Sequence, residues 1–304
     1  MYMELIEIEA FVAIVDHGAF TRAVDKLGIS QPAISRRIDL LEMELGAALF
    51  ERLRTGVRLT DAGEAFLPFA LRVLADLRDG ADAVTELVNG DCGAVTLAVV
   101  GTLASTSLLE RLRIFRTDHP GIQLRLQTAN SDGVSRLVRS GEVQLGLRYF
   151  DDPSTALETT QVTEETLVIV SATDSMIVPP TALRPSDLTG VPWVTFPVGS
   201  GSSGESFTKA MDRHLTGMGL ADAERIVIDS LTAQKRMIEA DFGIGMVAES
   251  AVSEERRLGT LRVLDIEGFE GSVPVYMILR AGGYQGAAMK RLIAALTDEP
   301  PNHR

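Results

Sequence analysis

Residues 19–67 read AFTRAVDKLGISQPAISRRIDLLEMELGAALFERLRTGVRLTDAGEAFL, a stretch that carries several helix start and stop signals. Gly28-Ile29-Ser30 provides a tight turn whose serine is a good helix N-cap. Pro32 falls in the next helical turn, where its missing N–H costs nothing. Gly46 can end that helix, because glycine tolerates the left-handed conformation of a helix stop. The stretch therefore predicts a helix over 31–45.

This expected helix has an apolar face and a polar face. Its apolar residues recur at helical spacing: Ile34, Ile38, Leu41 and Leu45. Residues 4–16 and 20–27 show the same amphipathic spacing, which predicts two shorter helices upstream. Three helices with a tight turn before the last one make a helix-turn-helix, whose last helix enters the DNA major groove. A generic three-helix core with solvated arginines is the alternative.

Basic residues gather in this helix and just after it. Segments 49–52 and 57–60 are predicted to form a small β-wing, with 54–56 at its tip. A glutamine can pair with adenine and an arginine with guanine, whereas wing arginines suit phosphate contacts. The basic residues between positions 36 and 58 are Arg36, Arg37, Arg52, Arg54 and Arg58. The sequence thus predicts a local basic face.

The net charge of −13 argues against nucleic acid as a partner, but the distribution of the charge matters more. Residues 1–60 carry seven Lys and Arg against nine Asp and Glu, so the rest of the chain carries most of the excess. A local basic face can still hold DNA phosphates, and the acidic remainder would discourage loose, non-specific binding.

The stretch contains a long and specific pattern. Its elements are Phe20, Ala23, Ser30-Gln31-Pro32-Ala33, Ser35, Leu41-Glu42, Leu45-Gly46, Leu49-Phe50-Glu51-Arg52, Leu59-Thr60 and Ala62-Gly63. This pattern resembles the N-terminal domain of the LysR-type transcriptional regulators. The resemblance implies that DNA is met by Gln31, Pro32, Ser35 and Arg36. Two departures are Ala19, where the family usually has a serine cap, and Val24, where it prefers alanine.

A long helical run is predicted from Asp61 to about Val88, with Thr60 as its cap. Its apolar stripe consists of Phe66, Ala70, Val73, Leu77, Ala81, Val84 and Val88. Pro68 is placed to kink it. The stripe favours a dimerising helix, because major-groove readers usually need two half-sites; a helix packed on its own domain is the alternative. Asn89-Gly90-Asp91 marks a domain boundary.

From Ala94 onward strands alternate with helices, which predicts a parallel sheet flanked by helices. The expected strands lie at 95–100, 122–127, 144–148, 166–171, 193–196, 225–228, 244–247 and 273–280. The expected helices lie at 105–117, 132–140, 204–218, 231–240 and 285–296.

The family resemblance extends to this part, carried by Phe115 with His119-Pro120 and by the turn Asp241–Gly245. It implies a fold of two α/β lobes, similar to periplasmic binding proteins, with the chain crossing between lobes near 162–165 and 266–272. The expected domains are a winged helix-turn-helix at 1–60, a dimerising linker helix at 61–90 and an effector-binding domain at 91–304. Lobe I is expected at about 91–163 and 268–304, and lobe II at about 164–267. The fold class is therefore α+β multidomain.

A cleft between two α/β lobes is a ligand site, and strand C-termini and helix N-termini point polar groups into it. The candidate effector-binding residues are Thr102, Ser105, Asn130, Ser131, Arg148, Thr195, Phe196 and Gly201. Arg148 beside helix-end amides suggests a carboxylate or another small anion as the effector. The alternative is that Arg148 pairs with a nearby acid, Asp151 or Asp152.

Two motifs suggest other functions. Gly199–Gly204 spells G-x-G-x-x-G, and Asp229 follows the next strand, as in a dinucleotide-binding domain, but the spacing between them is too long. Ser206–Lys209 fits S-x-x-K, but its partner motif K-T-G is absent, so we interpret it as a helix start. The single Cys92 and four scattered histidines give no metal-ligand spacing. We expect no catalytic residues, no metal and no cofactor.

The sequence thus predicts a transcription regulator that is not an enzyme. The N-terminus MYMELIEIEAF lacks the basic region of a signal peptide, and no apolar run reaches the roughly 18 residues of a membrane span, so a cytoplasmic location is expected. Expected partners are a pseudo-palindromic double-stranded DNA site, a small-molecule effector and further copies of the chain, giving a dimer and, by the resemblance, a tetramer; RNA polymerase is left open. A constitutive DNA-bending protein that has lost its ligand is the rival within this class.

Overall fold

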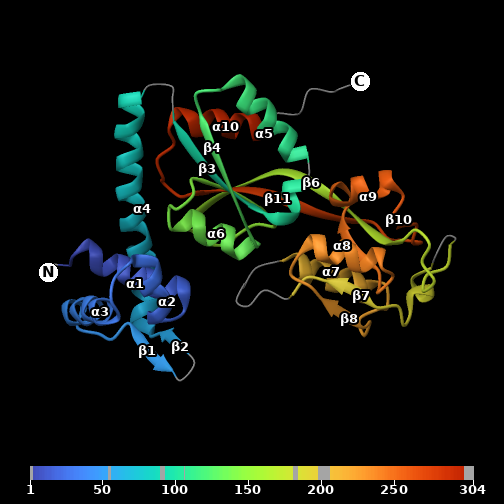
Figure 1. Cartoon of the computed structure of the whole chain (residues 1–304), viewed down its shortest axis with the longest axis horizontal. Coiled ribbons are helices and arrows are strands. Elements are labelled where there is room, and N and C mark those ends of the chain that lie inside the picture. The colour runs from blue at the N-terminus through green and yellow to red at the C-terminus, as the bar shows by residue number, and fades with distance from the viewer. Residues whose placement is uncertain are drawn as a thin grey trace. The chain divides into compact units, whose positions relative to one another are not determined.

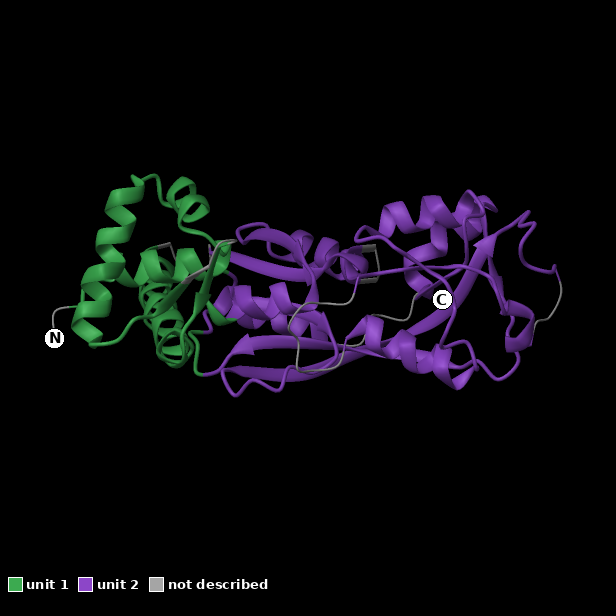
Figure 2. Cartoon of the chain, turned by 90° about the horizontal axis from the view of Figure 1, so that it is seen from below, with its two compact units in different colours: residues 1–88, 139–142, 282–284 green, residues 89–138, 143–281, 285–304 purple. Residues whose placement is uncertain are grey.

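The computed structural model describes residues 3–53, 56–89, 93–105, 107–180, 184–197 and 206–297. The chain divides into two compact units, shown in different colours in Figure 2. The first unit comprises residues 1–88 with the short segments 139–142 and 282–284, and the second comprises the remainder.

The first unit begins with the helices α1 (Leu5–His17), α2 (Phe20–Leu27) and α3 (Gln31–Leu45). Each ends at a glycine in the left-handed region, with φ of 65°, 65° and 68° at Gly18, Gly28 and Gly46. The Ser30 hydroxyl caps α3 by accepting a hydrogen bond from the Ala33 amide at 3.4 Å. The bounds of α2 and α3 are those that the sequence predicts.

The core of this unit joins the three helices to the wing. Ile34, Ile38 and Leu41 of α3 are at most 2 % exposed, so one face of the helix is held against the core. The strands β1 (Phe50–Leu53) and β2 (Gly56–Leu59) pair antiparallel, with Phe50 opposite Leu59. The Phe11 ring lies 5.3 Å from the rings of both Phe50 and Phe66, measured between centroids. The wing and the following helix therefore pack on α1.

The helix α4 (Asp61–Asn89) follows the wing without a break and contains Pro68 within its length. The Thr60 hydroxyl caps it by accepting a hydrogen bond from the Gly63 amide at 3.1 Å. Its apolar stripe divides in two. Ala70 is fully buried in the core of its own unit, whereas Val84 and Val88 are 61 % and 77 % exposed. The first turns thus match the alternative of a helix packed on its own domain, and the remaining turns leave apolar side chains in solvent.

The second unit is built on a seven-stranded mixed sheet of order β10-β6-β11-β5-β3-β4, with β9 pairing with β6 (Figure 1). The strands are β3 (Ala94–Val100), β4 (Gln123–Ala129), β5 (Leu145–Tyr149), β6 (Leu157–Ala172), β9 (Gly245–Ala248), β10 (Leu261–Leu264) and β11 (Gly271–Arg280). Strands β3, β4 and β5 are parallel, as expected. The prediction of a parallel sheet is wrong for the remaining strands, because β6, β9, β10 and β11 pair antiparallel.

The long strands β6 and β11 connect the two lobes. β11 pairs antiparallel with the N-terminal part of β6 and with β5, while the C-terminal part of β6 pairs with β9 and β10. Their register shifts between Val275 and Tyr276. The sequence located only the segment 166–171 of β6, because residues 157–165 are mostly polar and alternate poorly. The chain runs through the expected crossing near 162–165 within this single strand.

Helices cover both faces of the sheet in the first lobe. α5 (Ser107–Asp118) and α10 (Ala287–Thr297) share a core with Leu97 and Val99 of β3. α6 (Ser131–Arg139) packs on the opposite face, where it contacts Ala98. A Cβ atom at Gly146 of β5 would lie 2.6 Å from a Val134 methyl group, so glycine is needed for α6 to approach the sheet this closely.

The second lobe contains the two-stranded parallel sheet β7 (Trp193–Thr195) and β8 (Arg225–Val227) and three helices. The helices are α7 (Phe207–Gly217), α8 (Leu231–Glu239) and α9 (Ser253–Leu258). Figure 1 shows these elements grouped together, apart from the helices α5, α6 and α10 of the first lobe. Within the described part of the chain, no helix combines the length and the apolar character needed to cross a membrane.

Candidate functional site

The first candidate site is the polar face of α3. Gln31, Pro32 and Arg36 are exposed there, and Ser35 and Arg37 are partly exposed. Ile34 and Ile38 on the opposite face are buried, which fixes the orientation of the helix. The polar face therefore presents an amide, a hydroxyl and two guanidinium groups in the N-terminal half of the helix, where a major-groove reader contacts base edges.

The wing adds an arginine whose charge is already partly engaged. Arg58 of β2 lies opposite Glu51 of β1, and their side chains form an exposed ion pair at 2.5 Å. The hydrogen bonds that Arg58 donates to the Glu51 carboxylate raise the pKa of Arg58 above its ordinary value, so the guanidinium stays positive. To bind a phosphate, Arg58 must exchange this carboxylate for the phosphate. The Arg52 side chain and Arg54 lie outside the described residues.

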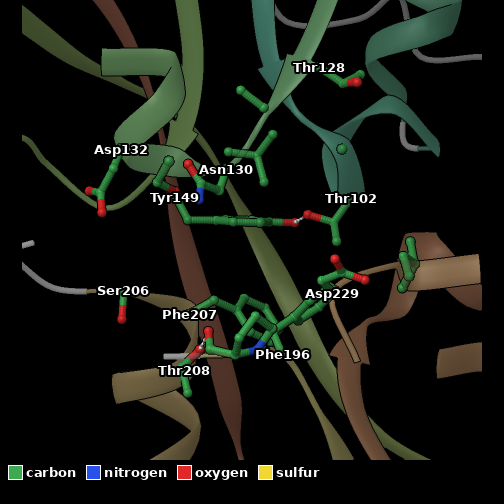
Figure 3. Close-up of a pocket in the computed structure, with 16 residues that line it drawn as sticks. Thr102, Thr128, Asn130, Asp132, Tyr149, Phe196, Ser206, Phe207, Thr208 and Asp229 are labelled. Atoms are coloured by element: carbon green, nitrogen blue, oxygen red, sulfur yellow. Dashed lines mark hydrogen bonds between the residues drawn. The ribbon is translucent and has the colours of Figure 1, made fainter. Parts of the chain in front are cut away.

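The second candidate site is a cavity of about 540 Å³ within the second unit, called here the pocket (Figure 3). It lies at the C-terminal ends of β3, β4 and β5, and residues of the second lobe line its other side. Its lining residues are Val100, Gly101, Thr102, Thr128, Ala129, Asn130, Ser131, Asp132, Tyr149, Phe196, Pro197, Ser206, Phe207, Thr208, Asp229 and Leu231. Both lobes thus contribute side chains to one cavity.

Tyr149 extends across the pocket and links the lobes. Its hydroxyl accepts a hydrogen bond from the Thr102 hydroxyl at 3.1 Å, and its ring lies 5.5 Å from the Phe207 ring (Figure 3). Phe207 in turn meets Phe196 edge-on at 5.9 Å. Burial raises the pKa of Tyr149, so the phenol stays protonated at neutral pH and can donate a hydrogen bond. The pocket therefore combines three aromatic rings with neutral hydroxyl groups.

Three helices begin at the pocket wall. The Asn130 side chain caps α6 by accepting from the Gly133 amide at 2.8 Å, and Ser206 caps α7 by accepting from the Lys209 amide at 3.3 Å. Ser230, next to the lining residue Asp229, caps α8 in the same way. Helix N-termini carry partial positive charge and free N–H groups, so the wall can receive negatively charged groups.

The structure brings together part of the effector-binding set that the sequence predicts. Thr102, Asn130, Ser131 and Phe196 line the pocket. Thr195 is buried and does not belong to the lining. The Ser105 side chain and Gly201 lie outside the described residues, so these two predictions stay untested. The lining residues that were not among the sequence-based candidates include Thr128, Asp132, Tyr149, Ser206, Phe207, Thr208 and Asp229.

The prediction that Arg148 lines the pocket is wrong. Its side chain is 3 % exposed and donates hydrogen bonds to the Asp152 carboxylate at 2.5 Å and to the Ser135 hydroxyl at 2.8 Å. The alternative pairing with Asp152 is the one observed. Successive residues of a strand face opposite sides, so it is Tyr149, one residue later, that faces the pocket.

Two sequence motifs, S-x-x-K and G-x-G-x-x-G, suggested other functions, and the structure describes only the first of them. Ser206 is the N-cap of α7 and its hydroxyl accepts a hydrogen bond from the helix backbone, which confirms the interpretation of Ser206–Lys209 as a helix start. The glycine-rich segment 199–204 lies outside the described residues. Asp229 lines the pocket, which joins it to residues of the first lobe.

The chain carries both a helix-turn-helix and a two-lobed domain with an internal pocket. This is the architecture of a transcription regulator with its own effector domain. Two family models match the sequence. "Bacterial regulatory helix-turn-helix protein, lysR family" matches residues 5–64, and "LysR substrate binding domain" matches residues 89–301. The chain belongs to the LysR family of DNA-binding transcriptional regulators.

Named relatives and solved structures agree with this assignment. The RuBisCO operon transcriptional regulator of Allochromatium vinosum is 27 % identical over 93 % of this chain and 91 % of its own length. The regulator CbbR of Rhodospirillum rubrum is 27 % identical over 96 % of this chain and 95 % of its own. The crystal structure of CbnR, a LysR family regulator, is 25 % identical with a TM-score of 0.65, covering 98 % of this chain and 100 % of CbnR. Full-length CbnR has also been solved in complex with its target DNA, at a TM-score of 0.62 and 25 % identity over 97 % of this chain and 99 % of that one.

Proposed function

We propose that this regulator acts in the cytoplasm, reads a pseudo-palindromic double-stranded DNA site and changes its assembly on that DNA when a small molecule binds in the pocket. The observation that carries the proposal is the combination of an exposed polar face on α3 with a cavity lined by two lobes. Ligand binding can shift an equilibrium only through a difference in affinity between two states. A cavity made by two lobes offers that difference, because its shape depends on their separation.

DNA is read by α3 in this proposal. Gln31 and Arg36 contact base edges, with Pro32 and Ser35 beside them, because all four lie on the helix face turned away from the core. The remaining arginines contact phosphates: Arg37, Arg52, Arg54 and Arg58. Base contacts supply specificity and phosphate contacts supply salt-dependent affinity.

Self-association is proposed through α4. Its exposed apolar side chains include Phe69, Val73, Leu77, Val84, Leu87 and Val88. A row of this length left in water would be unfavourable, and pairing with the same helix of a second copy would bury it. A dimer then presents two α3 helices to two half-sites, and pairing of effector domains would extend it to a tetramer. Contact with RNA polymerase is a further proposal of the same kind.

The proposed effector carries a carboxylate or another anionic group. Support for this group now comes from the N-terminus of α6, because Arg148 is paired elsewhere. Two N–H groups there, those of Ser131 and Asp132, precede the first intrahelical bond and have no acceptor among the described residues. The Ser131 hydroxyl lies beside them in the lining. Such a corner suits the two oxygens of a carboxylate.

The test is thermal unfolding of the full chain against carboxylates, aromatic acids, amino acids and phosphorylated sugars. A ligand at about 100 times its dissociation constant should stabilise the protein by about 2.7 kcal/mol. A stabilising compound must then change the gel-shift pattern on target DNA. If no compound stabilises the protein, the constitutive DNA-bending regulator becomes the better description.

A further inference from the structure

Two aspartates give the pocket a negative wall. Asp132 and Asp229 are the only charged side chains among the described lining residues, so the described wall contains no Lys, Arg or His. On the described wall, an effector that is only an anion would therefore meet two carboxylates and no fixed cation.

Neither carboxylate has an ion-pair partner among the described residues. No hydrogen bond or ion pair joins Asp132 or Asp229 to another described side chain, in contrast to Arg148 and Asp152 nearby. Asp132 belongs to the first turn of α6 in lobe I, and Asp229 precedes α8 in lobe II. Figure 3 shows them on opposite sides of the cavity, with Tyr149 between them. When the lobes approach each other, the two like charges repel.

The aromatic rings of the same cavity favour a cation. The rings of Tyr149, Phe207 and Phe196 form a connected group on the pocket wall. A positively charged nitrogen over an aromatic face is attracted by the ring quadrupole, and nearby carboxylates strengthen that preference. The Tyr149 hydroxyl, which accepts from Thr102, keeps its own proton for an acceptor atom of the ligand. The pocket thus offers a place for a cation and a separate place for an anion.

We propose that the effector is a zwitterion of the amino-acid class. Its carboxylate binds the N–H groups of Ser131 and Asp132 at the start of α6. Its protonated amine lies between Asp229 and the aromatic rings, where it offsets the repulsion between the two aspartates and favours the closed pocket. This inference rests on the proposed effector site and adds the charge of the ligand to it.

The experiment compares matched compounds on the full chain by thermal unfolding and then by isothermal titration calorimetry. All standard amino acids are screened first, followed by two triplets: leucine, isocaproate and isoamylamine; and phenylalanine, hydrocinnamate and phenethylamine. At least one amino acid should bind more tightly than its deaminated acid and than its decarboxylated amine. The amine and the carboxylate of the ligand are each expected to contribute about two- to tenfold in affinity, since the pocket wall that they contact is partly exposed to solvent.

The variant Asp229→Asn should lower the affinity for the binding amino acid by about two- to tenfold and leave the affinity for the deaminated acid equal or higher. The matched control is Asp222→Asn, an exposed aspartate of the same lobe outside the pocket, which should change neither affinity. The effect of Asp229→Asn should shrink as salt is raised.

Failure of this inference and failure of the proposed function give different results. Binding of a deaminated acid or a phosphorylated sugar but of no amino acid would overturn the zwitterion and keep the effector site. Binding of an amino acid that Asp229→Asn does not weaken would overturn the assignment of the amine to Asp229. Absence of binding by every class of compound would overturn both.

Discussion

The polar face of α3 and the pocket are built in opposite ways. The polar face draws all its residues from the segment 31–37 of one helix, whose other side is buried. The pocket takes its lining from segments between Val100 and Leu231 and from both lobes. A face on one rigid helix keeps its geometry whatever happens elsewhere, which suits the recognition of a fixed DNA sequence. A cavity divided between lobes changes shape when they move, which suits a switch.

The largest expected effect is a loss of stability of the effector domain in the variant Arg148→Ala. Arg148→Ala leaves the Asp152 carboxylate, which is 10 % exposed, without its cation. Removing one partner of a buried ion pair costs about 3–5 kcal/mol, because the remaining carboxylate loses the cation that balances its charge. The single tryptophan, Trp193, is fully buried in the second unit, so its fluorescence in a urea titration follows this unit alone.

The control for this prediction is the double variant Arg148→Met with Asp152→Asn, which removes both charges and should recover much of the loss. Wild-type stability of Arg148→Ala, combined with loss of ligand binding, would instead return Arg148 to the pocket.

The next effect is on the DNA-binding unit. Ile34→Ala removes a fully buried side chain from α3 and should destabilise the first unit by about 2–5 kcal/mol. Helical circular dichroism should then lose part of its signal at lower urea, while the fluorescence midpoint of Trp193 stays unchanged. A common shift of both signals would show that the two units unfold together.

Sequence reasoning found the polar face of α3 because each of its signals is local. Gly28, the Ser30 cap and Gly46 act within a few residues of the helix that they delimit, and helical spacing separates Ile34 and Ile38 from the exposed residues. These features do not depend on how distant segments pack.

The pocket was only partly predictable, because its lining depends on packing between distant segments. Arg148 and Tyr149 are neighbours at the end of β5, and a difference of one residue decides which of them faces the cavity. Thr102, Asn130 and Ser131 could be found because they follow strand ends. Asp229 was noticed only through another motif, since no local signal places it opposite lobe I.

A smaller effect is expected on DNA recognition. Arg36 is exposed on α3, and Arg36→Ala should weaken specific binding by about 1–3 kcal/mol if the guanidinium makes a bidentate contact with guanine. Gel shifts with base-substituted sites should also show relaxed preference at one base pair. The matched control is Arg116→Ala, an exposed arginine on α5 of the second unit. Equal losses on all sequences would make Arg36 a phosphate contact.

Two substitutions of Asn130 distinguish its role as the cap of α6 from its role in the wall of the pocket. Asn130→Ala removes the acceptor for the Gly133 amide and should destabilise the second unit by about 1 kcal/mol. Asn130→Asp keeps an acceptor at this position and should retain the stability, but it adds a negative charge to the pocket and should weaken binding of any carboxylate. Urea titration by Trp193 fluorescence and ligand calorimetry measure the two effects separately.

The smallest effect concerns the wing. Glu51→Gln removes the charge that pairs with Arg58, so the guanidinium becomes free to bind a phosphate without first leaving a carboxylate. DNA affinity should rise modestly for specific and non-specific sequences alike, because phosphate contacts carry no base information. The slope of log affinity against log salt should steepen by about one unit if one more phosphate is neutralised. An unchanged slope would mean that Arg58 stays clear of the DNA, which would leave recognition to α3 and to the basic residues beyond this pair.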